Sequence, residues 1–526
     1  MSVLVAESIS VQAGETTIVE PLDLRVDAGE CVAIIGESGS GKTMTARAIV
    51  GLLPRGVTAT GTVRMADEVV TLPAAERVWS SLRGDRVALL VQDPFTSLSP
   101  VHRCGAQLAA SLRAEDRRRG RARRGRAAMR EEVIRRLAEV RLDARVARQY
   151  PHELSGGMRQ RLAIAAALAA DPQVLVADEP TTALDATVQG EVLDLLAALS
   201  AERGMGLLLI SHDLGIVAGR AARVMVMSAG QVVESGPTES VLTRPEHPYT
   251  RRLLEASPSL HEVPERRMPD QGAPVAEMID VVKSFGDRQV LHGVSIELYA
   301  GQTLALVGES GSGKSTLARV LAGLETAESG SLRLRGEPLP MGRAGRHAEQ
   351  IQVVFQDPNS TLNPSFTVRR TLAEALGTAR GHADGHRGAG RQDVDALLRS
   401  VDLDPALASR HPASLSGGQR QRVAIARAIA VSPEVLICDE MVSALDVSVQ
   451  EQILTLLDRL RADLDLAVLF ISHDLAVVSQ VADRVAVMSE GRIVETGTTE
   501  QVIDYPRHEY TARLVESARS QSLIKE

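Results

Sequence analysis

The chain has 526 residues, which is too long for one hydrophobic core and predicts at least two domains. Its formal net charge of −8 gives no electrostatic reason to expect a nucleic-acid partner. Only three cysteines occur, far apart and without metal-ligand spacing, which argues against a disulfide framework, a zinc site or an iron–sulfur cluster. No apolar stretch approaches about 18 residues and the first ten residues lack an export signal, so we expect neither a membrane span nor secretion.

The first chemical motif follows an apolar run at Cys31–Ile35, which predicts a buried strand. The motif fits the P-loop pattern G-x-x-x-x-G-K-[ST] and reads Gly36-Glu37-Ser38-Gly39-Ser40-Gly41-Lys42-Thr43. Its glycines let the backbone N–H groups face a phosphate, and the following helix adds its N-terminal dipole. The lysine brings a positive charge to the β- and γ-phosphates, and the Thr43 hydroxyl can ligate Mg²⁺.

The same motif recurs 272 residues later, from Gly36 to Gly308, after an apolar run at Thr303–Val307. It reads Gly308-Glu309-Ser310-Gly311-Ser312-Gly313-Lys314-Ser315, followed by Thr316. The later motifs repeat as well, at an offset that settles at 261 because the first half carries insertions. The repeat predicts two similar domains of roughly 250 residues, at 1–257 and 274–526, with a Pro- and charge-rich linker at 258–273.

Within each half, apolar β-branched runs predict further buried strands. They are Val87–Val91, Val174–Ala177 and Leu207–Ile210, and then Ile351–Phe355, Val435–Cys438 and Val468–Ile471. Helical patterns separate them, so we predict an α/β fold with a mainly parallel sheet. Thr96–Arg161 and Ser360–Arg422 are mostly helical in pattern and predict an inserted helical subdomain in each half.

Two adjacent acids end one predicted strand in each half, as Asp178-Glu179 and Asp439-Glu440. An Asp at the tip of a buried strand beside a P-loop can hold the shell of Mg²⁺. The next residue points to the opposite side, where Glu179 or Glu440 can orient or deprotonate an attacking water.

Three further segments repeat at matching places. Leu154-Ser155-Gly156-Gly157 and Leu415-Ser416-Gly417-Gly418 each open a helix, with a serine cap and glycines that expose backbone donors. Gln92 and Gln356 end strands in Gln-Asp-Pro segments. His212 and His473 follow strands in identical Ile-Ser-His-Asp-Leu segments, and we predict that they sense phosphate.

Taken together, both halves resemble the nucleotide-binding subunits of ATP-binding cassette (ABC) transporters. P-loop, Q-loop glutamine, LSGG signature, Asp-Glu pair and switch histidine follow one another in that order over nearly the whole chain. The resemblance implies two tandem P-loop NTPase domains, each with a RecA-like core and a helical subdomain, which bind ATP and Mg²⁺ and hydrolyse ATP. In that family the halves pair head-to-tail, so that one half's signature caps the ATP on the other half's P-loop.

The resemblance also implies the functional residues. The catalytic residues would be Gln92, Glu179, His212, Gln356, Glu440 and His473. The Mg²⁺ ligands would be Thr43, Gln92, Asp178, Ser315, Gln356 and Asp439. ATP would contact both P-loops, Thr316, both signatures, and Phe285, which sits where the family places an aromatic ring on the adenine.

A narrower resemblance is to the oligopeptide/dipeptide importer group with its nickel and glutathione relatives. The extended Q-loops at 92–100 and 356–364 are similar to that group, and so is the tail motif His247-Pro248-Tyr249-Thr250-Arg251, with a weaker echo at 508–511. The chain would then be the fused ATPase of a peptide importer, a peripheral protein at the cytoplasmic face of the inner membrane. It would drive two integral membrane permeases and work indirectly with an extracytoplasmic solute-binding protein. Some relatives carry an iron–sulfur cluster in the tail, which we do not expect because the tails here lack cysteine.

Alternatives stay open. The chain could instead be a tandem-cassette ATPase that acts on the ribosome or on DNA, or the ATPase of an exporter. The Arg-rich run at 113–136 has nearby acids and no interleaved aromatic residues, so we interpret it as a solvated surface. The transported solute (peptide, nickel, glutathione or another) is left open.

The first half departs from the pattern at several positions. Ala13 aligns with Phe285, Met44 with Thr316, Met158 with Gln419 and Ala166 with Arg427. We therefore predict that the site built on the first P-loop binds ATP more weakly and that the second site dominates hydrolysis.

Overall fold

The computed structural model describes residues 1–91, 97–122, 124–181, 186–211, 213–257, 260, 272–357, 361–379, 391–443 and 445–521. The described residues up to 257 form one compact unit, and those from 260 onward form the other. Most of the predicted linker lies outside the described residues.

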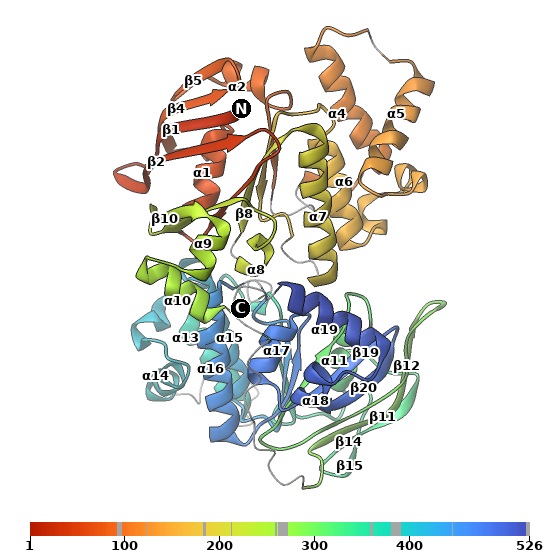
Figure 1. The fold of residues 1–526 in the computed structure, drawn as a ribbon. Coiled ribbons are helices and arrows are strands. Elements are labelled where there is room, and N and C mark those ends of the chain that lie inside the picture. The colour runs from red at the N-terminus through yellow and green to blue at the C-terminus, as the bar shows by residue number, and fades with distance from the viewer. Residues whose placement is uncertain are drawn as a thin grey trace. The chain divides into compact units, whose positions relative to one another are not determined.

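The first unit holds two sheets (Figure 1). One is antiparallel, in the order β2-β1-β4-β5, with bounds Ser2–Ala13 for β1, Thr16–Asp27 for β2, Val57–Met65 for β4 and Glu68–Leu72 for β5. The other has the order β10-β9-β3-β8-β7-β6 and is parallel except for the β9–β10 pair. Its strands are β3 Cys31–Ile35, β6 Val87–Leu90, β7 Val174–Asp178, β8 Gly206–Ser211, β9 Arg223–Ser228 and β10 Gln231–Pro237.

Helices connect and cover these strands. They are α1 Lys42–Ile49, α2 Glu76–Leu82, α4 Cys104–Arg118, α5 Arg126–Glu139, α6 Gly156–Ala167, α7 Ala186–Arg203, α8 Leu214–Val217, α9 Thr238–Thr243 and α10 Pro248–Ala256. Short 3₁₀ turns at Ala144–Arg148 and Pro151–Glu153 lead into α6.

The second unit repeats this plan. Its antiparallel sheet has the order β12-β11-β14-β15, with β11 Ala276–Phe285, β12 Arg288–Leu298, β14 Ser329–Leu334 and β15 Glu337–Leu339. Its larger sheet has the order β16-β17-β18-β13-β19-β20, with β13 Thr303–Val307, β16 Ile351–Val354, β17 Val435–Asp439, β18 Ala467–Ile471, β19 Arg484–Ser489 and β20 Arg492–Thr498. The helices are α11 Lys314–Leu321, α13 Val368–Ala379, α14 Arg391–Ser400, α15 Gly417–Ile429, α16 Val447–Leu464, α17 Leu475–Val481, α18 Thr499–Asp504 and α19 Glu509–Gln521, with 3₁₀ turns at Pro405–Ser409 and Pro412–Ser414.

Each larger sheet separates two hydrophobic cores. In β3, Ala33 and Ile35 face the core shared with α4 to α7, while Val32 and Ile34 face the core shared with α1 and the antiparallel sheet. Because successive side chains of a strand point to opposite faces, a strand buried on both faces is apolar throughout. This explains the uninterrupted apolar runs before both P-loops.

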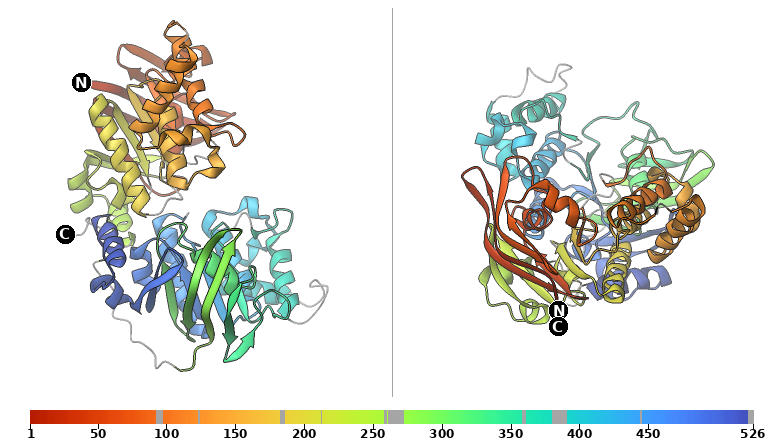
Figure 2. Two further views of the ribbon diagram at one scale, coloured as in Figure 1. Left: turned by 90° about the vertical axis from the view of Figure 1, so that its right-hand side faces the viewer. Right: turned by 90° about the horizontal axis from the view of Figure 1, so that it is seen from above.

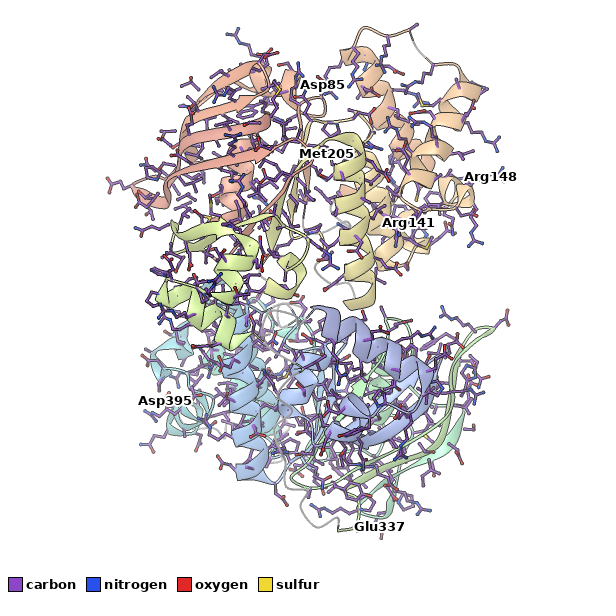
Figure 3. The ribbon with its side chains drawn as sticks, viewed as in Figure 1. Asp85, Arg141, Arg148, Met205, Glu337 and Asp395 are labelled. Atoms are coloured by element: carbon purple, nitrogen blue, oxygen red, sulfur yellow. The ribbon has the colours of Figure 1, made fainter. Side chains whose placement is uncertain are left out.

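A helical subdomain stands beside each larger sheet. Figure 2 shows α4 and α5 of the first unit, in orange, packed against one another. An ion pair of 2.9 Å between Arg119, just after α4, and Asp85, just before β6, ties this subdomain to the sheet. Asp85 is labelled in Figure 3. In the second unit Arg369 of α13 pairs with Asp395 of α14 at 3.4 Å.

The α/β class, the mainly parallel larger sheets and the helical subdomains agree with the sequence prediction, which did not include the antiparallel sheets. Two predicted strand ends were also one residue too long, because β6 ends at Leu90 and β16 at Val354. The neighbouring strand gives no further pairing partner beyond those residues. Among the described residues, no helix combines the length and apolarity needed to cross a membrane.

Substitutions of Phe470 test the packing of the second unit's core, because its side chain is fully buried in β18. Leu209 occupies the equivalent position in the first unit. We expect Phe470→Ala to lower the free energy of unfolding by about 3–5 kcal/mol, since it leaves a cavity. Phe470→Leu should cost less than about 1.5 kcal/mol because the first unit accepts leucine there. Denaturant titration of the two variants measures the difference, and equal losses would contradict this packing.

Candidate ATP-binding sites

Both P-loops close around their own lysine. Lys42 is only 5 % exposed, and its Nζ donates to the carbonyl oxygens of Gly36 at 2.7 Å and Glu37 at 2.8 Å. Lys314 is equally buried, and its Nζ donates to the equivalent carbonyls at the same two distances. Each loop therefore holds a buried positive charge at the start of a helix.

The first glycine of each loop is a point of close approach. A Cβ on Gly36 would lie 2.1 Å from the carbonyl oxygen of Met227, and one on Gly308 would lie 2.1 Å from that of Met488. Both glycines also have φ near +148°, where side chains are strained. The ends of β9 and β19 therefore pack directly against the P-loops and leave no room for a side chain at either glycine.

The loops suit a polyphosphate. The hydroxyls of Ser40 and Ser312 are buried and have no hydrogen-bond partner among the described residues, although a buried polar atom normally has one. Phosphate oxygens would supply the missing acceptor at the positive end of α1 or α11. A hollow of about 380 Å³ lies beside the second loop and is lined by Ser310, Gly311 and Ser312 among others.

A hydroxyl and a carboxylate meet beside each loop. Thr43 Oγ1 donates to Asp178 Oδ1 at 3.0 Å, and Ser315 Oγ donates to Asp439 Oδ1 at 3.1 Å. Burial raises the pKa of both aspartates, and the adjacent glutamates add to this, although the hydroxyl hydrogen bonds oppose it. A buried carboxylate beside a hydroxyl is a hard oxygen donor set, which fits Mg²⁺.

The predicted water-activating group lies in a strained conformation at the end of its strand. Glu179 and Glu440 both have φ near +47°, which is uncommon for residues other than glycine. Their backbone N–H groups donate to Ile210 and Ile471 of the neighbouring strands at 3.0 Å, which holds this turn. The strain is stored at the tip of the sheet, beside the Asp–hydroxyl contact.

In the second unit two other predicted residues, Gln356 and His473, contact Glu440. Gln356 Nε2 donates to Glu440 Oε2 at 3.0 Å, and His473 Nδ1 lies 3.6 Å from Glu440 Oε1. Burial opposes ionisation, but His473 and Lys314 outweigh it and lower the pKa of Glu440. In turn the Glu440 carboxylate raises the pKa of His473 in spite of its burial. Gln92 and His212, the counterparts in the first unit, lie outside the described residues.

The signature serines cap their own helices. Ser155 Oγ accepts from Met158 N at 3.3 Å, and Ser416 Oγ accepts from Gln419 N at 3.2 Å. In return, Gln419 Oε1 accepts from the Ser416 backbone N–H at 3.0 Å, which completes a capping box that Met158 cannot form. With methionine at position 158, the signature helix of the first unit therefore keeps the serine cap but lacks the second hydrogen bond of the capping box.

The second glycine of each signature is required by helix packing. A Cβ on Gly157 or Gly418 would lie 2.5 Å from Val188 or Val449, on the following long helix. Sequence reasoning assigned these glycines only to phosphate contact. Gly156 and Gly417 form the first turn of α6 and α15.

The predicted adenine platform is exposed in the second unit. Phe285 ends β11 with 48 % of its surface exposed, and Lys283 Nζ lies 4.8 Å from its ring centroid. Thr316 lies half-buried in the first turn of α11, where Met44 lies in α1. Ala13 ends β1 and offers no ring.

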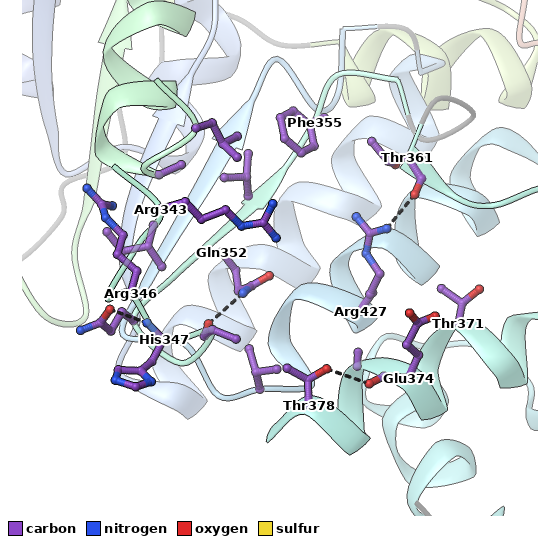
Figure 4. A pocket seen from close by; sticks show the side chains of 18 of the residues that line it. Arg343, Arg346, His347, Gln352, Phe355, Thr361, Thr371, Glu374, Thr378 and Arg427 are labelled. Carbon is purple, nitrogen blue, oxygen red and sulfur yellow. Dashed lines mark hydrogen bonds between the residues drawn. The ribbon is translucent and has the colours of Figure 1, made fainter. Parts of the chain in front are cut away.

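Sequence reasoning missed a second hollow of about 850 Å³ in the second unit, between the end of β16 and the helical subdomain (Figure 4). Arg427 of α15 reaches across it and donates to the carbonyl oxygen of Thr361 at 2.7 Å. Glu374 and Phe355 also line it. Burial lowers the pKa of Arg427 and, more strongly, that of Arg346 to about 10. In the first unit Ala166 stands at the position of Arg427. An alanine side chain cannot make the hydrogen bond that Arg427 makes to Thr361.

Comparison with known proteins identifies the family. Residues 19–182 and 291–443 match the family described as ABC transporter, which covers more than half of the chain. The chain belongs to the ABC transporter family. Residues 233–288 and 494–521 match the oligopeptide/dipeptide transporter C-terminal region. The resemblance predicted from the motifs is thereby confirmed for both halves and for the tails.

Curated relatives match nearly the whole length of this ABC transporter subunit. It is 41 % identical to the glutathione import ATP-binding protein of Pectobacterium atrosepticum over 96 % of this chain and 87 % of that protein. It is also 41 % identical to the protein of the same name from Escherichia coli K12, over 94 % and 86 %. The chain is an ATP hydrolase, the energy-coupling ATP-binding subunit of an importer. Membership implies permease partners and a peripheral position at their membrane.

Solved structures support the fold alone. The structure titled RNase-L Inhibitor has a TM-score of 0.62 at 20 % identity and covers 97 % of this chain and 93 % of that one. A complex of the archaeal ribosomal stalk protein with the archaeal ribosome recycling factor has a TM-score of 0.61 at 19 % identity, over 95 % and 90 %. Both agree with the tandem P-loop NTPase fold predicted from the sequence.

Gly308→Ala tests the close approach at the second P-loop. The new Cβ would overlap the Met488 carbonyl, and at φ +147° alanine is also strained by roughly 1–3 kcal/mol. Because the loop must change shape to relieve this, we expect ATP to bind this site about 5- to 150-fold more weakly in equilibrium binding. Gly336→Ala is the control, because Gly336 has φ +80° with open space around it and lies outside the P-loop. Unchanged ATP affinity in Gly308→Ala would contradict the geometry.

Proposed function

We propose that this chain drives the import of short peptides of the glutathione class through two integral membrane permeases. The names of its relatives and the oligopeptide/dipeptide tail support that substrate class. The chain would lie at the cytoplasmic face of the inner membrane, and an extracytoplasmic solute-binding protein would deliver the solute to the permeases.

The observation that carries the proposal is the repetition of one site in both units. Each has a buried P-loop lysine, a hydroxyl bound to an aspartate, and a glutamate in a left-handed turn. The recurrence of these three groups argues for two ATP sites and for two domains, at 1–257 and 274–526. A degenerate half would have lost at least one of these groups.

Each group has a distinct task in hydrolysis. Lys42 and Lys314 would exchange their carbonyl partners for β- and γ-phosphate oxygens, and the loop N–H groups would bind the same anion. Thr43 with Asp178, and Ser315 with Asp439, would hold Mg²⁺ together with Gln92 and Gln356. When bound, Mg²⁺ supplies positive charge to the phosphate oxygens.

Glu440 is suited to the work of a general base. Its lowered pKa keeps it ionised at neutral pH, and Gln356 and His473 fix its two oxygens in place. His473 carries a raised pKa and can place positive charge near the γ-phosphate. Glu179 and His212 would act in the same way at the first site.

Each ATP would be completed by the other unit's signature. Lys42, Asp178, Glu179 and His212 would pair with Ser416 to Gly418, and Lys314, Asp439, Glu440 and His473 with Ser155 to Gly157. The signatures cap α6 and α15, whose N-termini offer backbone donors to a γ-phosphate. Hydrolysis would remove that anion and open the pair.

The 850 Å³ hollow suits contact with a permease. It lies directly beside Phe355, whose neighbour Gln356 touches Glu440. A permease segment seated there would act on the hydrolytic centre through one residue. Arginines at positions 343, 346 and 427 favour an acidic segment as the occupant.

Reconstitution tests the proposed function. The full chain, co-expressed with its two permeases, should co-purify with both of them from membranes. Vesicles holding the complex should accumulate labelled glutathione or dipeptides only with ATP and the binding protein. Co-sedimentation with ribosomes or DNA at moderate salt, without permeases, would contradict the proposal.

The unequal sites give a second test. We expect Glu440→Gln to reduce transport-coupled ATP hydrolysis by about 10²–10⁴-fold, because it removes the general base of the site that has Phe285 and Thr316. The matched variant Glu179→Gln should cause a much smaller loss. Steady-state ATPase rates of the two complexes make the comparison, and equal losses would refute the dominance of the second site.

A further inference from the structure

The tail motif of each unit touches the P-loop of the same unit. The backbone N–H of Glu37 donates to the Tyr249 hydroxyl at 3.1 Å, across 212 residues of sequence. The N–H of Glu309 donates to the Tyr510 hydroxyl at 2.8 Å. We call this hydrogen bond the tail contact. Both tyrosines are nearly buried, with 9 % and 8 % of their surface exposed.

A chain of hydrogen bonds holds the first tyrosine in place. The Glu234 carboxylate on β10 accepts from the backbone N–H groups of Glu246 at 2.8 Å and His247 at 3.1 Å. His247 Nδ1 then accepts from the N–H of Tyr249 at 3.2 Å and caps α10. The ring of Tyr249 is thus oriented from the sheet edge before it reaches the P-loop.

The second unit builds the same chain from a different sequence. Glu495 accepts from Arg507 at 2.9 Å and from His508 at 3.0 Å, and His508 Nδ1 accepts from Tyr510 N at 3.1 Å. Glu509 replaces the proline of the first motif. The acid, the histidine, the tyrosine and the threonine after it are kept while the residue between histidine and tyrosine has changed, so the tail contact is among the features that the two motifs share.

The tail contact fixes a specific part of the loop. Glu37 directly follows Gly36, which the Met227 carbonyl confines from the end of β9. Its carbonyl oxygen accepts from Lys42 at 2.8 Å, while its N–H is bound by Tyr249. One residue therefore joins the tail to the P-loop lysine. Glu309 has the same two partners, Lys314 and Tyr510.

We propose that Tyr249 and Tyr510 are positioning residues that hold each P-loop in its ATP-receiving shape. The inference rests on ATP binding by these loops, as argued above. Without the hydroxyl the N–H of Glu37 or Glu309 loses its partner, and the loop occupies the receiving shape for a smaller fraction of the time. The apparent dissociation constant rises by the inverse of that fraction. Bound ATP restores the shape, so the rate at saturating ATP stays the same.

Tyr249→Phe and Tyr510→Phe in the full chain test this, because phenylalanine keeps the ring and removes only the hydroxyl. Loss of one such hydrogen bond should raise the KM for ATP and the dissociation constant at the altered site by about 2- to 10-fold. The kcat should change by less than about 2-fold. Hydrogen exchange without nucleotide should accelerate in the peptide that holds Glu37 or Glu309, and added Mg-ATP should restore protection. Tyr505→Phe is the control, because Tyr505 is 69 % exposed in the same tail.

Two results would overturn the inference. Unchanged exchange and KM in a chain that binds ATP normally would show that the hydroxyls do not position the loops. A fall in thermal stability with faster exchange throughout the unit, and with KM unchanged, would make the tyrosines ordinary core residues. If the wild-type chain bound no ATP at either loop, the proposed function would fail first and this inference with it.

Discussion

A lysine ammonium taken out of water is the constraint on which both halves of this protein depend. Lys42 and Lys314 are almost fully buried, and loop carbonyls hold each of them. A buried charge is expensive unless it is paired. The buried strand before each loop, the close-packed glycine at its start and the helix that follows all keep the ammonium inside the P-loop. The ATP chemistry follows from that arrangement.

Groups on two sides of each P-loop lysine are linked to the loop by hydrogen bonds. On one side, a hydroxyl and a buried aspartate provide oxygen ligands, and the neighbouring glutamate is turned into a strained conformation. On the other side, the tail tyrosine binds the N–H of the residue whose carbonyl holds the lysine. The second unit adds Gln356 and His473 on the two oxygens of Glu440. Phosphate binding, water activation and the tail therefore meet within one loop and the strand tip beside it.

Local patterns were enough to predict much of this. The strands at Cys31–Ile35 and Thr303–Val307 have the predicted bounds, because burial on both faces leaves an unbroken apolar run. The antiparallel sheets escaped prediction because β1 and β11 contain register shifts, which break the alternation expected of a half-buried strand. The tail contact and the Gln356–Glu440 bond join residues 212 and 84 positions apart, so no spacing rule reveals them. The packing need at Gly157 and Gly418 likewise depends on a helix that follows much later.

The number of ATP molecules bound per chain tests the central claim most directly. Equilibrium binding of Mg-ATP to the full chain should give two ATP per chain, with the tighter site on the second P-loop. Lys42→Ala should abolish the weaker site and Lys314→Ala the tighter one, each leaving the other site occupied. A single ATP per chain, or two sites that survive both substitutions, would contradict the claim that each buried lysine organises its own ATP site.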